Sequence, residues 1–440
     1  RLNSQTLALV NNNLHYMACP MKTHPEVRSL HLHRFDKCAP LIAEAKNLEV
    51  LSVQKCRWSL EETFANVSPL TVIFFRDVKM PRGGLRLDNL RAINVYIEGC
   101  SINLKDSHLP ECVDRLHLTS THKLHADHIA VAVDRSNLKE LAICARLELS
   151  STGDAKVEGT ANTTPKIGAL ASVQTLALIG VRGTGEALSD LIRPGSLASL
   201  TSLTLCTHHQ LPKSFGAMLT QRTTPPVTCL TLGAYVWNAQ SDKWTTQSSS
   251  CDWMQDKVCL PHVIELNLIG CSLPEGSWAT IGTMSNLHRL RLDRTRDRSK
   301  NKTGMPSLPK LEFLSLNHIS EKFSIARLTN PDNSFKNLTT LRAEGKVFQL
   351  NPNSCSYLRH SPLVQHLTEV SLADAWLPID DILNFLYAFD ESSSVPHLQR
   401  LSLSRAILQV KNIEERKTLL HSFLKFCEKG GAKLTHLVLQ

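Results

Sequence analysis

Two stretches of the chain share one pattern: Ala92–Ile102 reads AINVYIEGCSI, and Val263–Leu273 reads VIELNLIGCSL. In both, apolar residues stand at the first, fourth and sixth positions, and a glycine and a cysteine stand at the eighth and ninth. Side chains alternate between the two faces of an extended chain, so the fourth and sixth residues share a face. The pattern therefore predicts a short strand with one buried face.

The same spacing of apolar residues returns along most of the chain. Twelve close copies begin at Leu48, Leu70, Leu138, Val173, Leu200, Val227, Val263, Leu287, Leu311, Leu367, Leu398 and Leu434, and four weaker ones at Val27, Ala92, Val113 and Leu338. Successive copies begin 21 to 36 residues apart. A single such strand cannot bury its apolar face, whereas stacked parallel strands bury a continuous ladder, at roughly 1.5–3 kcal/mol for each covered side chain. The period predicts a solenoid.

Three copies, Leu48–Cys56, Ala92–Cys100 and Val263–Cys271, resemble the cysteine-containing type of leucine-rich repeat. The resemblance covers about Val27 to the last residue, and the C-terminal part is similar to the ribonuclease-inhibitor-like type. It implies an α/β leucine-rich-repeat solenoid of about sixteen irregular repeats. We expect a curved parallel sheet on the concave side, with helices and loops on the convex side. Apolar spacing predicts helices over Ile379–Asp390 and Ile413–Lys429.

The chain departs from this family at the ninth position of many repeats. Where the family has Asn or Cys, this chain has Phe35, Val78, Thr121, Arg146, His208, Tyr235 and Lys346. In the family that side chain satisfies backbone groups in the turn after the strand. We therefore expect other contacts to hold some of the turns.

The length of 440 residues exceeds the roughly 250–300 residues that one compact core fills. We expect a flanking segment over residues 1–26 and a solenoid over 27–440, with polar insertions near 150–168 and 238–257. The longest uncharged runs are too polar for a membrane span. Thirteen cysteines without a CxxC pair indicate reduced thiols, so we expect an intracellular protein whose compartment is unknown.

Side chains between the apolar positions should line the open face of the sheet, which is large enough for a protein partner. The candidate partner-binding residues on this concave face are His31, His33, Phe74, Arg76, Tyr96, Arg115, His117, Arg289, Arg291, Asp293, Arg342 and Arg400. A basic loop follows at Arg294, Arg296, Arg298, Lys300 and Lys302. The formal charge of +9 and this loop favour an acidic protein partner, with nucleic-acid phosphates as the alternative.

Motifs for catalysis or phosphate binding are absent from the sequence. His122, His125 and His128, with Asp127, come nearest to a metal set, and they would share a face only if the segment were helical. We expect no enzyme, no catalytic residue, no cofactor and no metal. The predicted function is protein–protein recognition or scaffolding on the concave face. The alternatives are a subunit of a ribonucleoprotein or other large assembly, a ubiquitin-ligase substrate receptor, and an extracellular or immune-type sensor.

Overall fold

The structure is a computed structural model. It describes residues 6–10, 26–35, 42, 45–58, 69–80, 84–105, 107–133, 136–148, 170–182, 197–207, 210–211, 213–221, 226–238, 243–246, 249–255, 258–298, 305–319, 335–345, 366–374, 376–378, 383, 398–404, 407–409, 412–430 and 435–438. The chain divides into two compact units. Unit 1 comprises Arg1–His209, Arg222–Pro225 and Trp237–Lys243, and unit 2 comprises Gln210–Gln221, Pro226–Val236 and Trp244–Gln440.

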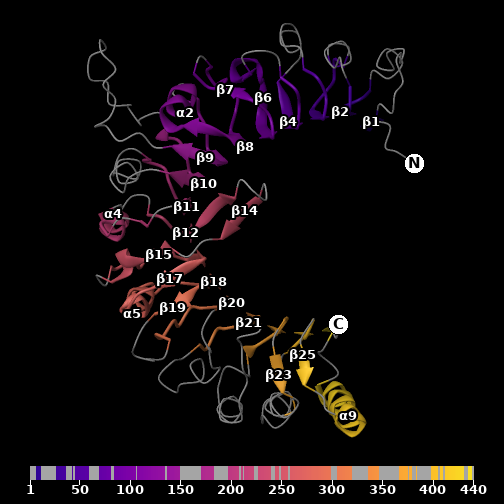
Figure 1. The fold of residues 1–440 in the computed structure, drawn as a ribbon, viewed down its shortest axis with the longest axis vertical. Coiled ribbons are helices and arrows are strands. Elements are labelled where there is room, and N and C mark those ends of the chain that lie inside the picture. The colour runs from indigo at the N-terminus through magenta and orange to yellow at the C-terminus, as the bar shows by residue number, and fades with distance from the viewer. Residues whose placement is uncertain are drawn as a thin grey trace. The chain divides into compact units, whose positions relative to one another are not determined.

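Unit 1 is built on a ladder of parallel strands that follow one another in chain order (Figure 1). Its strands are β1 (Thr6–Val10), β2 (Ser29–His33), β3 (Val50–Gln54), β4 (Leu70–Arg76), β6 (Ala92–Glu98), β8 (Arg115–His125), β9 (Glu140–Glu148), β10 (Thr175–Arg182) and β11 (Ser202–Thr207). A second, short parallel pair joins β5 (Leu85–Arg86) to β7 (Ile102–Asn103). The described helical turns are η2 (Leu87–Asn89) and α2 (Ala126–Val133).

Unit 2 repeats this arrangement with its own parallel ladder. Its strands are β12 (Cys229–Gly233), β16 (Glu265–Ile269), β18 (Arg289–Asp293), β20 (Phe313–Asn317), β21 (Thr340–Glu344), β22 (Glu369–Ser371), β24 (Arg400–Ser402) and β26 (His436–Val438). Short side ladders join β15 (Ser249–Ser250), β17 (Cys271–Leu273) and β19 (Arg296–Asp297), and also β23 (Trp376–Pro378) and β25 (Ile407–Gln409). The described helices are α4 (Phe215–Gln221), η4 (Asp252–Met254), α5 (Ser277–Gly282) and α9 (Ile413–Gly430), and β13 (Tyr235–Asn238) and β14 (Lys243–Thr246) fall where the two units divide.

The apolar positions of the repeat form the core. In unit 1, one row of side chains in register on successive strands is fully buried, at 0 % exposure for each member: Leu30, Leu51, Ile73, Val95 and Leu116. This parallel ladder confirms the leucine-rich-repeat interpretation. The structure does not confirm the count of about sixteen repeats. It also does not confirm the expected helical layer, because helices are few among the described residues.

The helix expected over Ile413–Lys429 is confirmed by α9, whereas residues 379–390 lie outside the described residues except for residue 383. The insertion expected near 150–168 lies outside them as well. Thr6–Val10 lies in the segment expected to precede the solenoid, yet β1 pairs in parallel with β2 along its whole length. The ladder therefore begins before Val27, because the alternating residues of β1 can extend it.

The turn after the strand requires a left-handed backbone at the eighth position of the repeat. Ten residues at this position have φ between +48° and +113°: Arg34, Lys55, Asp77, Gly99, Gly180, Gly270, Arg294, His318, Gly345 and Asp374. Glycine adopts this conformation freely, whereas other residues pay roughly 1–2 kcal/mol. The repeat therefore tolerates strain at six of these turns to keep the strands aligned.

The ninth residue secures the turn to the preceding repeat. The Cys56 thiol lies 3.7 Å from the carbonyl oxygen of Leu32 and accepts a hydrogen bond from the Phe35 amide at 3.2 Å. Thr295 occupies the same position in a later repeat, and its hydroxyl donates to the Leu268 carbonyl at 3.1 Å. The Thr295 hydroxyl thus replaces the cysteine thiol in bonding the turn to the preceding repeat. This bond is one of the other contacts expected from the sequence.

Strands β8, β9 and β10 run past the place where the other strands turn. They have eleven, nine and eight residues, and the register between β8 and β9 shifts between Thr119 and Lys123. Arg146 replaces the ninth-position cysteine of β9, and its Nε is buried without a hydrogen-bond partner.

The eighth position gives a first prediction. Gly345 has φ +113°, and a Cβ there would lie 2.9 Å from Nδ1 and 3.1 Å from Cα of His318. Gly345→Ala should cost about 1–3 kcal/mol and lower the thermal midpoint. At the same position of another repeat Lys55→Gly should leave the midpoint unchanged or raise it, because it removes left-handed strain at φ +52°. In a melting experiment, an unchanged midpoint for Gly345→Ala or a lowered midpoint for Lys55→Gly would contradict this account of the turn.

The buried thiols give a second prediction. Burial disfavours the thiolate and raises the pKa of Cys100 to about 11, so only about 0.1 % of it is ionised at pH 8. Cys259 is exposed. Iodoacetamide should therefore modify Cys259 far faster than Cys100 in the folded protein, as followed by peptide mass spectrometry. The two should react alike in guanidinium chloride, and equal rates in the folded protein would contradict the buried ladder.

Candidate functional site

The open face of unit 1 brings four of the predicted binding residues into one row. His31, Phe74, Tyr96 and His117 occupy equivalent positions of β2, β4, β6 and β8, with Ser52 of β3 between the first two. Phe74, Tyr96 and His117, which we call the aromatic row, are each half-buried. The Tyr96 and His117 rings meet edge to face, with centroids 4.8 Å apart. Ala142 of β9 and Ala177 of β10 continue the row.

One carboxylate flanks the aromatic row. Glu140 of β9 accepts a hydrogen bond from Nε2 of His117 at 2.7 Å, and its other oxygen lies 3.5 Å from Nε of Arg115. One carboxylate thus holds two predicted site residues, and it fixes the orientation of the His117 ring.

The remaining predicted residues of unit 1 lie in the next row toward the ends of the strands. His33 of β2, Gln54, Arg76 and Glu98 are in register. Arg76 Nε lies 3.5 Å from a carboxylate oxygen of Glu98. These residues border the aromatic row rather than belong to it.

The open face of unit 2 places its arginines around a phenylalanine. The guanidinium carbon of Arg289 lies 4.7 Å from the centre of the Phe313 ring, and that of Arg342 lies 5.6 Å from it. A cation over an aromatic face is attracted by the ring quadrupole. Phe313 therefore holds both arginine side chains close to the sheet.

Carboxylates of this face compensate most of its predicted arginines. Arg289 Nε lies 3.9 Å from Glu265, and Arg291 lies 3.6 Å from Asp293, the predicted acidic member of the site. Arg342 donates to Glu369 from Nε at 3.1 Å and from Nη2 at 2.8 Å. Such exposed pairs contribute only about 0–1 kcal/mol each, but they cancel charge that an acidic partner would need.

Sequence reasoning missed several residues of these faces: Glu140, Glu265, Phe313, Glu369 and His436. All stand at the third position of their repeats. The same position supplied the predicted Arg115, Arg289 and Arg400. That shared position was the signal that could have found them.

The basic loop is described in part. Arg294, Arg296 and Arg298 are exposed, whereas Lys300 and Lys302 lie outside the described residues. Asp297, in the same segment, is buried and accepts a hydrogen bond from Nε1 of Trp278 at 2.9 Å.

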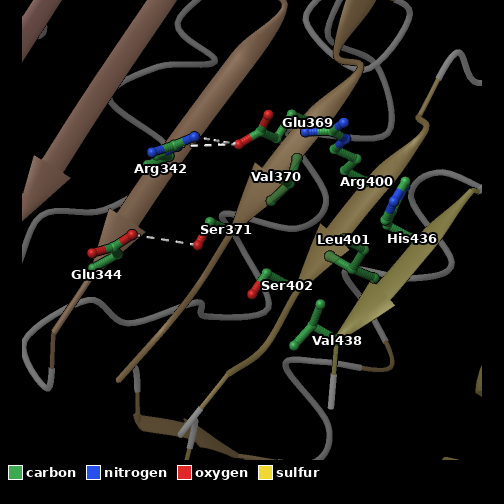
Figure 2. Close-up of a pocket in the computed structure, with 10 residues that line it drawn as sticks. All are labelled: Arg342, Glu344, Glu369, Val370, Ser371, Arg400, Leu401, Ser402, His436 and Val438. Atoms are coloured by element: carbon green, nitrogen blue, oxygen red, sulfur yellow. Dashed lines mark hydrogen bonds and ion pairs between the residues drawn. The ribbon is translucent and has the colours of Figure 1, made fainter. Parts of the chain in front are cut away.

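A polar hollow of about 360 Å³ lies on the open face of unit 2, over β21, β22, β24 and β26 (Figure 2). It includes the predicted residues Arg342 and Arg400. Glu344, Glu369 and His436 also line it.

The histidines considered for a metal do not form a ligand set. His122 and His125 belong to β8 and His128 to α2, so the helical segment that would align them is absent; the rings of His125 and His128 are 5.4 Å apart. Within the ranges that the structure describes, no group of three or more His, Cys, Asp or Glu residues could hold a metal ion. Among the same residues, no helix is long and apolar enough to cross a membrane.

Comparison with known proteins gives only distant likenesses. No protein-family model matches the chain, and no curated protein matches its sequence. A leucine-rich-repeat protein of Leptospira interrogans is 16% identical with a TM-score of 0.48, over 98% of this chain and 95% of that one. An internalin of Listeria monocytogenes is 13% identical with a TM-score of 0.35, over 91% and 83%.

TLR13 in a TLR13–ssRNA13 complex is 15% identical with a TM-score of 0.46, over 93% of this chain and 63% of that one. These likenesses assign no function to the chain. Its fold rests on its own repeat and register. On those grounds the chain is a leucine-rich-repeat solenoid.

Proposed function

We propose that this protein is a non-enzymatic recognition subunit that binds a protein partner on the open face of its parallel sheet. The aromatic row of unit 1 is the anchor of that surface. One observation carries the proposal: Phe74, Tyr96 and His117 stand in register on β4, β6 and β8, on the face opposite the buried ladder.

The aromatic row has the properties of an interface anchor. Aromatic side chains offer large contact area and dominate the binding energy of many interfaces. The hydrogen bond from His117 to Glu140 and the edge contact with Tyr96 hold the row in place before a partner arrives. A preorganised anchor loses less conformational entropy on binding.

The surroundings of the row leave room for a partner. Ala142 and Ala177 follow His117 on β9 and β10, so the row continues in small side chains. Nine strands spaced about 4.8 Å apart give unit 1 a face roughly 38 Å long. That length matches the scale of a protein interface, at about 800 Å² per partner, better than that of a metabolite site.

The basic loop supports a second candidate function, a subunit of a ribonucleoprotein. Arg294, Arg296 and Arg298 expose three guanidinium groups along one short segment. Phosphate contacts of this kind weaken steeply as salt rises. Protein recognition through the aromatic row would depend far less on salt.

Affinity purification from the native source tests the proposal. The variant Phe74→Ser/Tyr96→Ser/His117→Ser should retain at least tenfold less of the partner that the unaltered protein captures, because anchors of this kind account for more than 1.4 kcal/mol. Val131→Ser is the matched control, since it removes an apolar side chain, 48 % exposed, from α2. Circular dichroism should show all variants folded.

Two outcomes would contradict the proposal. Equal capture by the triple variant and the control would remove the aromatic row from the interface. Loss of all captured chains between low and moderate salt, with release by ribonuclease, would favour the ribonucleoprotein function instead.

A further inference from the structure

The polar hollow of unit 2 is lined by both positive and negative side chains. Figure 2 shows Arg400 and Glu344 toward opposite ends of it, with Ser371 and Ser402 between them. Among the described residues, neither charged side chain has an ion pair like those of Arg289, Arg291 and Arg342.

At the end of the hollow near Arg400, two arginine side chains lie next to one carboxylate, that of Glu369. Glu369 stands in register with Arg400 on the neighbouring strand, and its Oε1 already accepts both hydrogen bonds from Arg342. Within the described part of the chain Arg400 makes no ion pair. His436 stands beside it on β26. Its Nδ1 is hydrogen-bonded to the Thr435 hydroxyl at 2.8 Å, and its Nε2 has no hydrogen-bond partner among the described residues. This end therefore suits a carboxylate.

The negative end holds an uncompensated carboxylate. The side chain of Glu344 meets one side-chain donor among the described residues, the Ser371 hydroxyl at 3.5 Å. A hydrogen bond of that length is weak. A cationic group brought to this end would therefore find an acceptor that the protein itself leaves almost unused.

The positions of the two ends fix the length of a ligand that spans them. Arg400 lies two strands from Glu344 and four residues nearer the start of the strands, as the register shows. With strands about 4.8 Å apart and about 3.3 Å per residue, the Cα atoms are roughly 16 Å apart. Because side chains reach inward from both ends, an extended peptide needs two to four residues between its own charged groups.

We propose that the polar hollow binds an extended peptide segment that pairs an acidic side chain with Arg400 and a basic side chain with Glu344. Phosphate fits less well, because Glu344 and Glu369 line the same small volume and repel a dianion. Opposite charges at a fixed spacing give register and specificity rather than high affinity. The site does not depend on the aromatic row, which belongs to unit 1.

A random octapeptide library displayed on phage and selected on the full chain tests the proposal. Enriched sequences should carry an acidic and a basic residue separated by two to four others. The synthetic consensus peptide, followed by fluorescence polarisation, should bind at least tenfold more weakly to Arg400→Gln and to Glu344→Gln. Arg416→Gln and Glu428→Gln, which neutralise exposed charges on α9, should bind it unchanged.

The charge-exchanged variant Glu344→Arg/Arg400→Glu separates recognition from structural damage. It should prefer the peptide in which the acidic and basic residues are exchanged. Selection of peptides with one sign of charge or none, or a consensus that Arg400→Gln and Glu344→Gln bind normally, would overturn the proposal. Because this selection needs no natural partner, it can fail while the aromatic row still proves to be an interface, and the reverse also holds.

Discussion

The structure depends on one constraint: a strand of five or so residues with one apolar face can bury that face only against its neighbours. Leu51, Ile73 and Val95 are 0 % exposed because each is covered by the equivalent residues of adjacent repeats. No repeat supplies its own core. Stability is therefore a sum of contacts between neighbouring repeats, and each repeat must place its strand in the same register.

The requirement for register explains the features that deviate from ordinary preference. Left-handed residues such as Arg34 and His318 accept strain because the chain must leave the strand at the same point in each repeat. The thiol of Cys56 and the hydroxyl of Thr295 tie that point to the preceding repeat. The same register sets the open face, since it places side chains from repeats more than twenty residues apart at one level of the sheet.

The sequence predicted the parallel ladder and the α9 helix because both follow from the spacing of apolar residues along a short stretch of chain. For the same reason it predicted that Phe74, Tyr96 and His117 lie on the open face of the sheet. It did not predict how the arginines of unit 2 are paired with carboxylates, because Arg342 meets Glu369 across 27 residues of chain. Lateral pairing depends on which rotamers meet between strands, and spacing within one strand carries no information about that. The role of Thr295 was missed because the repeat pattern favours Cys or Asn there.

The central claim, parallel strands in register, is tested most directly by cross-linking across one pair of strands. Phe74→Cys with Tyr96→Cys places two thiols at equivalent positions of β4 and β6, where strands about 4.8 Å apart allow a disulfide. Oxidation followed by peptide mass spectrometry should link residue 74 to residue 96. A link from residue 74 to an engineered cysteine at Asn94 or Glu98 instead, with none to residue 96, would contradict the register on which the whole account rests.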